Sequence, residues 1–272
     1  MRGVGVAVVV QRVESRSNRL LSKLGTPSHR PASVLSSADG ADSSRAARRV
    51  RRDLVESVRT RLYQGHPACD MLRELERAVA GNLFVFGGTV RRAIFGGVQS
   101  ADIDIMVPNW DDRAFAALRN WNIPCEMNRR GHRRFRWHGV QIDVNQPKEW
   151  DPRFRSVAQT LRYFDLRVNS LAVHLGSGVV LDPLRLLVQR DNNDIGVNWK
   201  RWSRMPPTEL VLLGIRLLRI LDETHQYSIS REDRARARRL ILRQLDFSDW
   251  ASIGDRFPSG KDEFRALTLL QL

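Results

Sequence analysis

The chain has few cysteines, no long apolar run and no grouped histidines. Its 272 residues contain only two cysteines, Cys69 and Cys125, which excludes a disulfide-rich scaffold and a zinc site with paired ligand spacing. No apolar run approaches the roughly 18 residues that a membrane-spanning helix needs, so no membrane partner is expected. The six histidines form no metal-ligand or catalytic-triad pattern. These absences leave a soluble chain in a reducing compartment as the expectation.

Acidic residues and lysine are also scarce. Thirty Asp and Glu stand against 45 Lys and Arg, giving a formal net charge of +15 and a pI near 11.2. Lysine occurs only at positions 23, 148, 200 and 261, so the positive charge is nearly all arginine. Arginine suits bidentate phosphate contacts, and a strongly basic chain predicts an anionic partner, most simply nucleic acid. Solvated helix faces and a GC-rich genome are the plainer explanations of the same excess.

Composition divides the chain into three parts. Residues 1–45 are rich in Arg, Ser and Ala with only three acids, which predicts a flexible basic segment. That composition is typical of an organellar transit peptide and equally of a disordered bacterial N-terminus, so the cytoplasm and an organellar matrix both stay open. A mixed pattern of strands and helices follows over 46–200, and a helical segment is expected over 201–272.

Hydrophobic alternation predicts strands at 83–86, 102–107, 125–128, 133–138, 140–145 and 179–181. Helical spacing predicts a helix from 44 to 80 with a break at 64–67, and a short helix that follows the turn at 87–88 and runs through 94. Further helices are expected at 111–121, at 166–173 and from 208 onward.

Two short motifs within 83–107 carry the chemistry. Asp102 and Asp104 alternate with Ile103, so both carboxylates point to one face of a strand, where a divalent metal with hard oxygen ligands, magnesium above all, offsets their repulsion. Gly87 and Gly88 form a turn before a helix, which lets a phosphate chain approach backbone amides at the helix N-terminus. Together the motifs predict phosphoryl or nucleotidyl transfer.

A third carboxylate, Asp143, alternates with apolar neighbours on the strand at 140–145. Beside the Asp102 strand it would face the same metals. Two Mg²⁺ ions held by three acids would activate an attacking 3′-hydroxyl and stabilise the leaving pyrophosphate. The plainer alternative is a solvent-facing residue on a half-buried strand.

The segment GGTVRRAIFGGVQSADIDIMV resembles the signature of the polymerase-β-like nucleotidyltransferases, and more narrowly the bacterial-type tRNA nucleotidyltransferase and poly(A) polymerase family. The matching residues are Gly87, Gly88, Val90, Arg91, Gly96, Asp102 and Asp104. The resemblance implies an α+β head domain with a mixed sheet, followed by a helical neck. It also implies an NTP substrate, ATP or CTP, with its triphosphate held by Gly87, Gly88 and Arg91. The family's acid after that arginine is Arg92 here.

A second match lies at 165–172, where DLRVNSLA is similar to the family's R-R-D-F-T-x-N-A-L-A. The resemblance implies that Asp165 and Asn169 lie near the ribose. The two arginines that precede the family's aspartate, which it places near the triphosphate, are Tyr163 and Phe164 here, so Arg162 or Arg167 is expected to supply that charge. A third match, Asp182-Pro183, follows at about the family's distance.

The neck departs from the family. The E-D-x-x-R element that selects the incoming base is absent from 206–210, although Arg216 aligns with a later neck arginine and is expected at the nucleotide. A literal match at 232–236 lies too far on and is interpreted as coincidence. The family's long helical body also needs more chain than follows the neck, so the base and the acceptor stay unspecified.

The stretch at 129–138 predicts a basic hairpin that contacts RNA phosphates and stacks a base. Its candidate RNA-binding residues are Arg129, Arg130, Arg133, Arg134 and Arg136. The alternative is an exposed hairpin whose aromatic residues, Phe135 and Trp137, point into the core.

The leading hypothesis is a template-independent, magnesium-dependent nucleotidyltransferase that extends an RNA 3′ end, either tRNA or another RNA. Two other readings stay open. One is a non-catalytic RNA-binding subunit of a ribonucleoprotein, such as an organellar ribosome or an assembly complex. The other is a toxin-type nucleotidyltransferase.

Overall fold

A computed structural model describes the chain over residues 37–96, 102–110, 123–127, 131–187, 194–205 and 228–242, with four residue pairs between 209 and 221. The helix expected at 111–121, Arg129 and Arg130 lie outside the described residues. So do most of the N-terminal segment and the chain after position 242.

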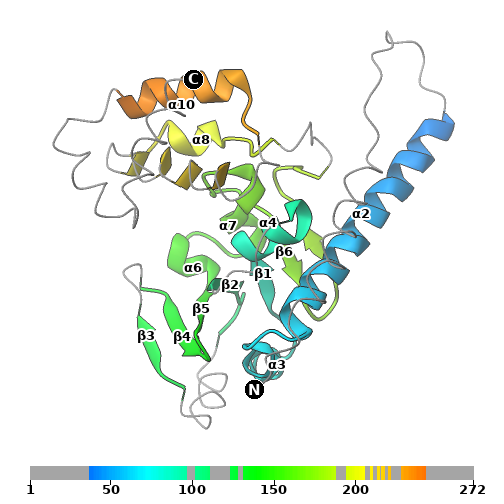
Figure 1. The fold of residues 1–272 in the computed structure, drawn as a ribbon, viewed down its shortest axis with the longest axis vertical. Helices are drawn as coiled ribbons and strands as arrows, with labels where there is room; N and C mark the ends of the chain where they lie inside the picture. The colour runs from blue at the N-terminus through cyan, green and yellow to red at the C-terminus, as the bar shows by residue number, and fades with distance from the viewer. Residues whose placement is uncertain are drawn as a thin grey trace, which may run out of the picture.

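A seven-stranded mixed sheet forms the centre of the molecule (Figure 1), in the order β3-β4-β5-β2-β1-β6-β7. Only β2 and β5 pair in parallel; the other neighbours are antiparallel. The strands are β1 (Phe84–Phe86), β2 (Asp102–Met106), β3 (Cys125–Met127), β4 (Arg133–Trp137), β5 (Val140–Asn145), β6 (Ala172–His174) and β7 (Val180–Leu181). The architecture confirms the predicted α+β class.

Alternation along the strands gives the sheet two different faces. Ile103, Ile105, Ile142 and Val144 are buried in the main core, where residues of α2 and α3 also pack. The opposite face carries a smaller apolar cluster that includes Phe86, Met106 and Leu161 of α7. Asp102 and Asp104 of β2, Arg134 of β4 and Asp143 of β5 share that second face, so the smaller cluster borders them.

The helices flank the sheet, and the N-terminal half of α2 projects from the body (Figure 1). Met71, Leu72 and Leu75 of α3 are buried at helical spacing, as their pattern predicted. The helices are α2 (Ser37–Tyr63), α3 (Cys69–Ala78), α4 (Gly88–Phe95), α6 (Pro147–Trp150), α7 (Val157–Leu161), α8 (Trp199–Trp202) and α10 (Arg231–Leu242). No helix among the described residues is long and apolar enough to cross a membrane.

One predicted helix is wrong. The stretch 166–173 forms a single 3-10 turn, Arg167–Asn169, and then strand β6, with Ala172 opposite Phe86 of β1. Short apolar runs fit a buried strand as well as a helix, and pairing with the edge of β1 decides between them here.

The acidic start of α10 anchors this helix to the segment before α8. Asp233 accepts hydrogen bonds from Trp199 Nε1 at 2.5 Å and from the Val197 backbone N at 3.3 Å. The Arg236 guanidinium lies 4.3 Å from the centre of the Trp199 ring. The pattern at 232–236 therefore has a packing role.

Candidate active site

The glycine turn lies directly against one of the predicted metal-binding acids. Gly87 has φ +65°, and a Cβ at this position would lie 3.0 Å from Asp104 Oδ2. At Gly88 a Cβ would lie 2.8 Å from Arg92 Nη1. At Gly87, only glycine gives the positive φ and the close approach to Asp104 without strain. The N-terminus of α4 and the Asp104 carboxylate therefore form one site.

Strand pairing brings the three predicted acids onto one face of the sheet. In the parallel β2–β5 pair, Asp104 lies opposite Asp143, and Asp102 lies opposite Gln141. Burial, then the negative charges of Asp143 and Asp102, raise the pKa of Asp104 to about 6, while Arg216 and Arg91 act in the opposite direction. Five groups that the sequence placed in one site are thus electrostatically coupled.

The third acid is bound by an arginine of the same chain. Arg134 lies opposite Asp143 in the antiparallel β4–β5 pair. Its Nε donates to Asp143 Oδ1 at 2.8 Å, and its Nη2 donates to Oδ2 at 2.9 Å. This two-pronged pair occupies both carboxylate oxygens.

The donor set fits a magnesium ion in part. Mg²⁺ is usually held by one or two carboxylates together with substrate phosphates, and Asp102 and Asp104 supply two such groups beside a phosphate-sized turn. Among the described residues, however, no group of three His, Cys, Asp or Glu side chains is arranged to hold a metal ion. Asp143 is the predicted ligand that would have to share its oxygens with Arg134.

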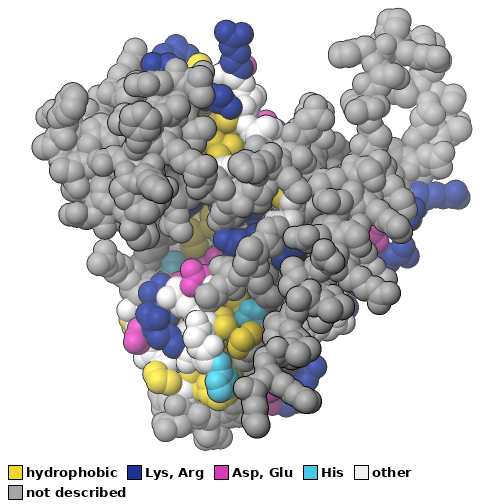
Figure 2. All heavy atoms as spheres, in the orientation of Figure 1, with side chains coloured by type: hydrophobic (Ala, Val, Ile, Leu, Met, Phe, Trp, Pro, Cys, Tyr) yellow, Lys and Arg dark blue, Asp and Glu magenta, His cyan; other side chains and the backbone are white. Residues whose placement is uncertain are grey.

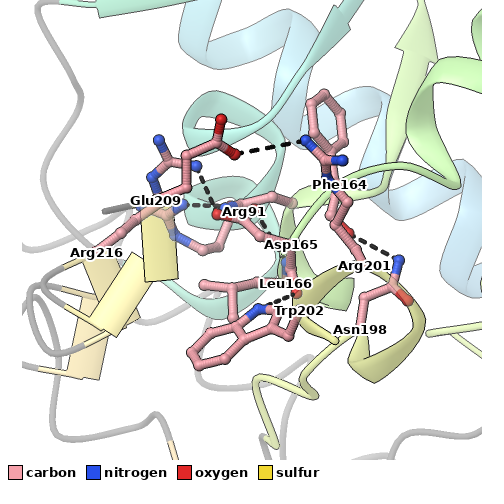
Figure 3. A network of polar contacts seen from close by, with 10 residues as sticks. Arg91, Phe164, Asp165, Leu166, Asn198, Arg201, Trp202, Glu209 and Arg216 are labelled. Carbon is pink, nitrogen blue, oxygen red and sulfur yellow. Dashed lines mark hydrogen bonds and ion pairs between the residues drawn. The ribbon is translucent and has the colours of Figure 1, made fainter. Parts of the chain in front are cut away.

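The two predicted ribose-binding residues are likewise paired with arginines. Arg91 Nη1 donates to Asn169 Oδ1 at 2.5 Å. Arg216 Nη1 donates to Asp165 Oδ2 at 2.5 Å (Figure 3). The Asp165 side chain is only 4% exposed, and its Oδ1 accepts from the Leu166 backbone N. Arg216, 42% exposed, thereby links the helical neck to the head.

An arginine that the sequence did not indicate stands beside Tyr163. The guanidinium of Arg201 from α8 lies 5.2 Å from the centre of the Tyr163 ring and 3.8 Å from Glu209 Oε2. The two residues expected to supply positive charge near the triphosphate lie elsewhere. Arg162 is exposed, and the aliphatic part of the Arg167 side chain packs against Gly196. The only signal in the sequence was an aromatic ring where the family has arginine.

The described part of the basic hairpin is largely tied to its own chain. Arg133 binds Glu149 at 2.7 Å, and Arg134 binds Asp143, whereas Arg136 is 59% exposed and lies 3.7 Å from Glu126. Basic and acidic side chains accordingly lie together over this end of the sheet (Figure 2). Phe135 is buried in the core, so it cannot stack a base.

The fold matches those of known enzymes, although the chain matches no family model and no curated protein sequence. A CCA-adding enzyme in complex with CTP superposes with a TM-score of 0.56 at 17% identity, over 80% of this chain and 55% of that one. The Thermotoga maritima CCA-adding enzyme complexed with tRNA gives 0.54 at 16% identity, over 80% and 54%. A CCA-adding enzyme with ATP gives 0.50 at 15% identity, over 74% and 51%.

The chain spans about half the length of these structures. The likeness confirms the fold that the motifs predicted: a mixed-sheet α+β head domain like that of the CCA-adding enzymes.

Proposed function

We propose that this chain, which has the fold of the CCA-adding nucleotidyltransferases, transfers a nucleotide from ATP or CTP to the 3′ end of an RNA, with Mg²⁺ as cofactor. The observation that carries the proposal is the contact between the Gly87 turn and Asp104, with Asp102 and Asp143 in the adjoining positions of the sheet. A phosphate-binding turn and carboxylates within one contact distance match the needs of nucleotidyl transfer.

The residues have separate roles in this proposal. Asp102 and Asp104 would hold the metal, which supplies activation of the 3′-hydroxyl and charge neutralisation at the pyrophosphate. Gly87 and Gly88 leave room for the triphosphate at the backbone N–H groups of α4.

Arg91 and Arg216 add positive charge at the same place. Both guanidiniums lower the pKa of Asp104, so they lie close enough to act on a triphosphate bound there. Each is held in position by its partner, Asn169 for Arg91 and Asp165 for Arg216. In this arrangement Asp165 and Asn169 act on the nucleotide through the two arginines.

The test is nucleotide incorporation by the full chain. The protein is incubated with total RNA, Mg²⁺ or Mn²⁺ and each labelled NTP in turn, and labelled RNA is separated by size. We expect label on RNA 3′ ends that is lost in D102N and in D104N. The matched control is D151N, which removes an acid that pairs with Arg153 and not with any residue assigned to the metal or the nucleotide. Undiminished labelling in the D102N/D104N double variant would refute the mechanism.

A second candidate function follows from the three internal arginine pairs. Because Arg134, Arg216 and Arg91 bind the side chains expected to contact metal or nucleotide, the same structure is compatible with a non-catalytic RNA-binding subunit of a ribonucleoprotein. Absence of labelling together with tight, salt-sensitive RNA binding would favour this candidate.

A further inference from the structure

A row of three charged side chains crosses the polar face of the sheet. Arg134 of β4, Asp143 of β5 and Asp104 of β2 are direct neighbours in register. Residues directly opposite each other in a sheet share a face and lie within side-chain reach. Asp143 therefore has a carboxylate on one side and a guanidinium on the other.

The guanidinium is better placed than any other described group to neutralise Asp143. It makes two hydrogen bonds of 2.8 and 2.9 Å, one to each oxygen. Glu126, which lies opposite Arg134 on β3, is an exposed acid within 3.7 Å of Arg136 instead. Arg134 therefore pairs with Asp143 on β5 and not with Glu126 on β3.

A metal ion at Asp143 would conflict with this arrangement. Mg²⁺ requires near-ideal octahedral geometry, whereas both Asp143 oxygens already accept hydrogen bonds from the guanidinium, whose positive charge would also repel a cation bound there. Asp102 and Asp104 lie on β2, one strand farther from Arg134. The hydrogen bonds of Arg134 therefore occupy only the third carboxylate.

We propose that Arg134 supplies within the chain the positive charge that a second metal ion would supply at Asp143, so that the protein binds one divalent cation, at Asp102 and Asp104. The inference rests on the proposed function, because it assigns the metal stoichiometry of that same site. Arg134 is a positioning residue here, since it acts through Asp143 rather than on the substrate.

The experiment measures Mn²⁺ binding to the full chain without nucleotide, with free Mn²⁺ followed by electron paramagnetic resonance. We expect one ion per wild-type chain. We expect R134Q to bind a second ion, because the charge-assisted pair at Asp143 is gone. The affinity of R134Q for this second ion should be at least about tenfold higher than any second-site affinity of wild type. In R134Q/D143N the second ion should be lost again.

R136Q is the matched control: it removes the same charge from the same face of β4 but leaves Asp143 paired. It should bind Mn²⁺ as wild type does. R134K keeps the charge without the two-pronged geometry, so its affinity for the second ion should fall between those of wild type and R134Q. If R134Q does not fold, as thermal melting would show, R134K decides the question.

Equal Mn²⁺ stoichiometry and affinity in wild type and the Arg134 variants would overturn the inference, as would two ions in wild type. Failure of the proposed function gives a different result: the labelling assay would then show no nucleotide incorporation, whereas wild type would still bind one Mn²⁺ and R134Q two.

Discussion

Gly87 brings the glycine turn against one of the predicted metal-binding acids, because its missing side chain leaves room for the Asp104 carboxylate. We expect G87A to destabilise the fold by about 1–3 kcal/mol, since alanine is strained at φ +65°. It should also abolish nucleotide incorporation, because the added Cβ displaces Asp104. Chemical denaturation and the labelling assay measure the two effects.

G139A separates strain from displacement. Gly139 has φ +78° in the β4–β5 turn, and a Cβ there meets no atom within 4 Å. This variant should be destabilised to a similar extent but keep its activity once folded. Equal activity loss in both variants would show that the Gly87 contact has no special role.

Asp104 also predicts a pH dependence of stability in the metal-free protein. Its pKa is about 6 in the folded chain, above the usual value for an aspartate, so the native state keeps a proton that the unfolded state loses. Between about pH 4 and 6 the stability of the wild type should therefore fall as the pH rises. D104N lacks this dependence. In EDTA, the Tm of D104N minus the Tm of wild type should therefore increase from pH 4 to pH 7.

Magnesium should reduce the Tm difference between D104N and wild type at pH 7, because the ion stabilises only the carboxylate form of Asp104. A Tm difference that stays constant with pH would contradict the prediction.

Single residues were predictable from the sequence where a spacing fixed their place. Strand alternation was enough to put Asp102 and Asp104 on one face, whereas the position of Asp143 opposite Asp104 depended on the pairing of β5 with β2. The partners of Asp143 and Asp165 were not predictable, because Arg134 and Arg216 are chosen by strand pairing and by neck packing. Those choices depend on tertiary structure, which local patterns do not carry.

Among the elements, the neck is joined to the head by the Arg216–Asp165 pair. Removing Arg216 leaves a buried carboxylate without its cation, so R216A should lower the free energy of unfolding by about 1–3 kcal/mol. D165N/R216A should recover part of that loss, because the unpaired charge is gone. Denaturation of the four chains of this double-mutant cycle gives the coupling energy, and additive losses would mean that the pair is not coupled.

Strands were predicted better than helices. All six expected strands begin within one residue of strands in the structure, because a two-residue alternation can be recognised over short segments. The helix expected at 166–173 failed because β6 is chosen by its partner β1.

At the scale of the whole molecule, exposed arginines occur on α2 at Arg48 and Arg52 and on α10 at Arg236 and Arg239, two helices that lie apart in Figure 1. If α2 contacts RNA, R48Q/R52Q should weaken binding and reduce the slope of log K against log salt by about 0.7 per lost contact to a single strand. Filter binding at several salt concentrations measures the slope.

The control is R73Q/R77Q, which removes an exposed pair of arginines at the same spacing on α3 and leaves the same net charge. Equal slopes in the two double variants would mean that α2 adds only general charge.

The Arg134–Asp143 pair has a consequence for how the chain folds. These residues are nine positions apart in a hairpin, whereas the β2–β5 contact between Asn145 and Ile105 spans 40 positions. Short loops close first, so we expect the hairpin to form before β2 docks against it. Asp143 is then already neutralised when Asp104 arrives, and the parallel pairing of the two acidic strands need not wait for a metal ion.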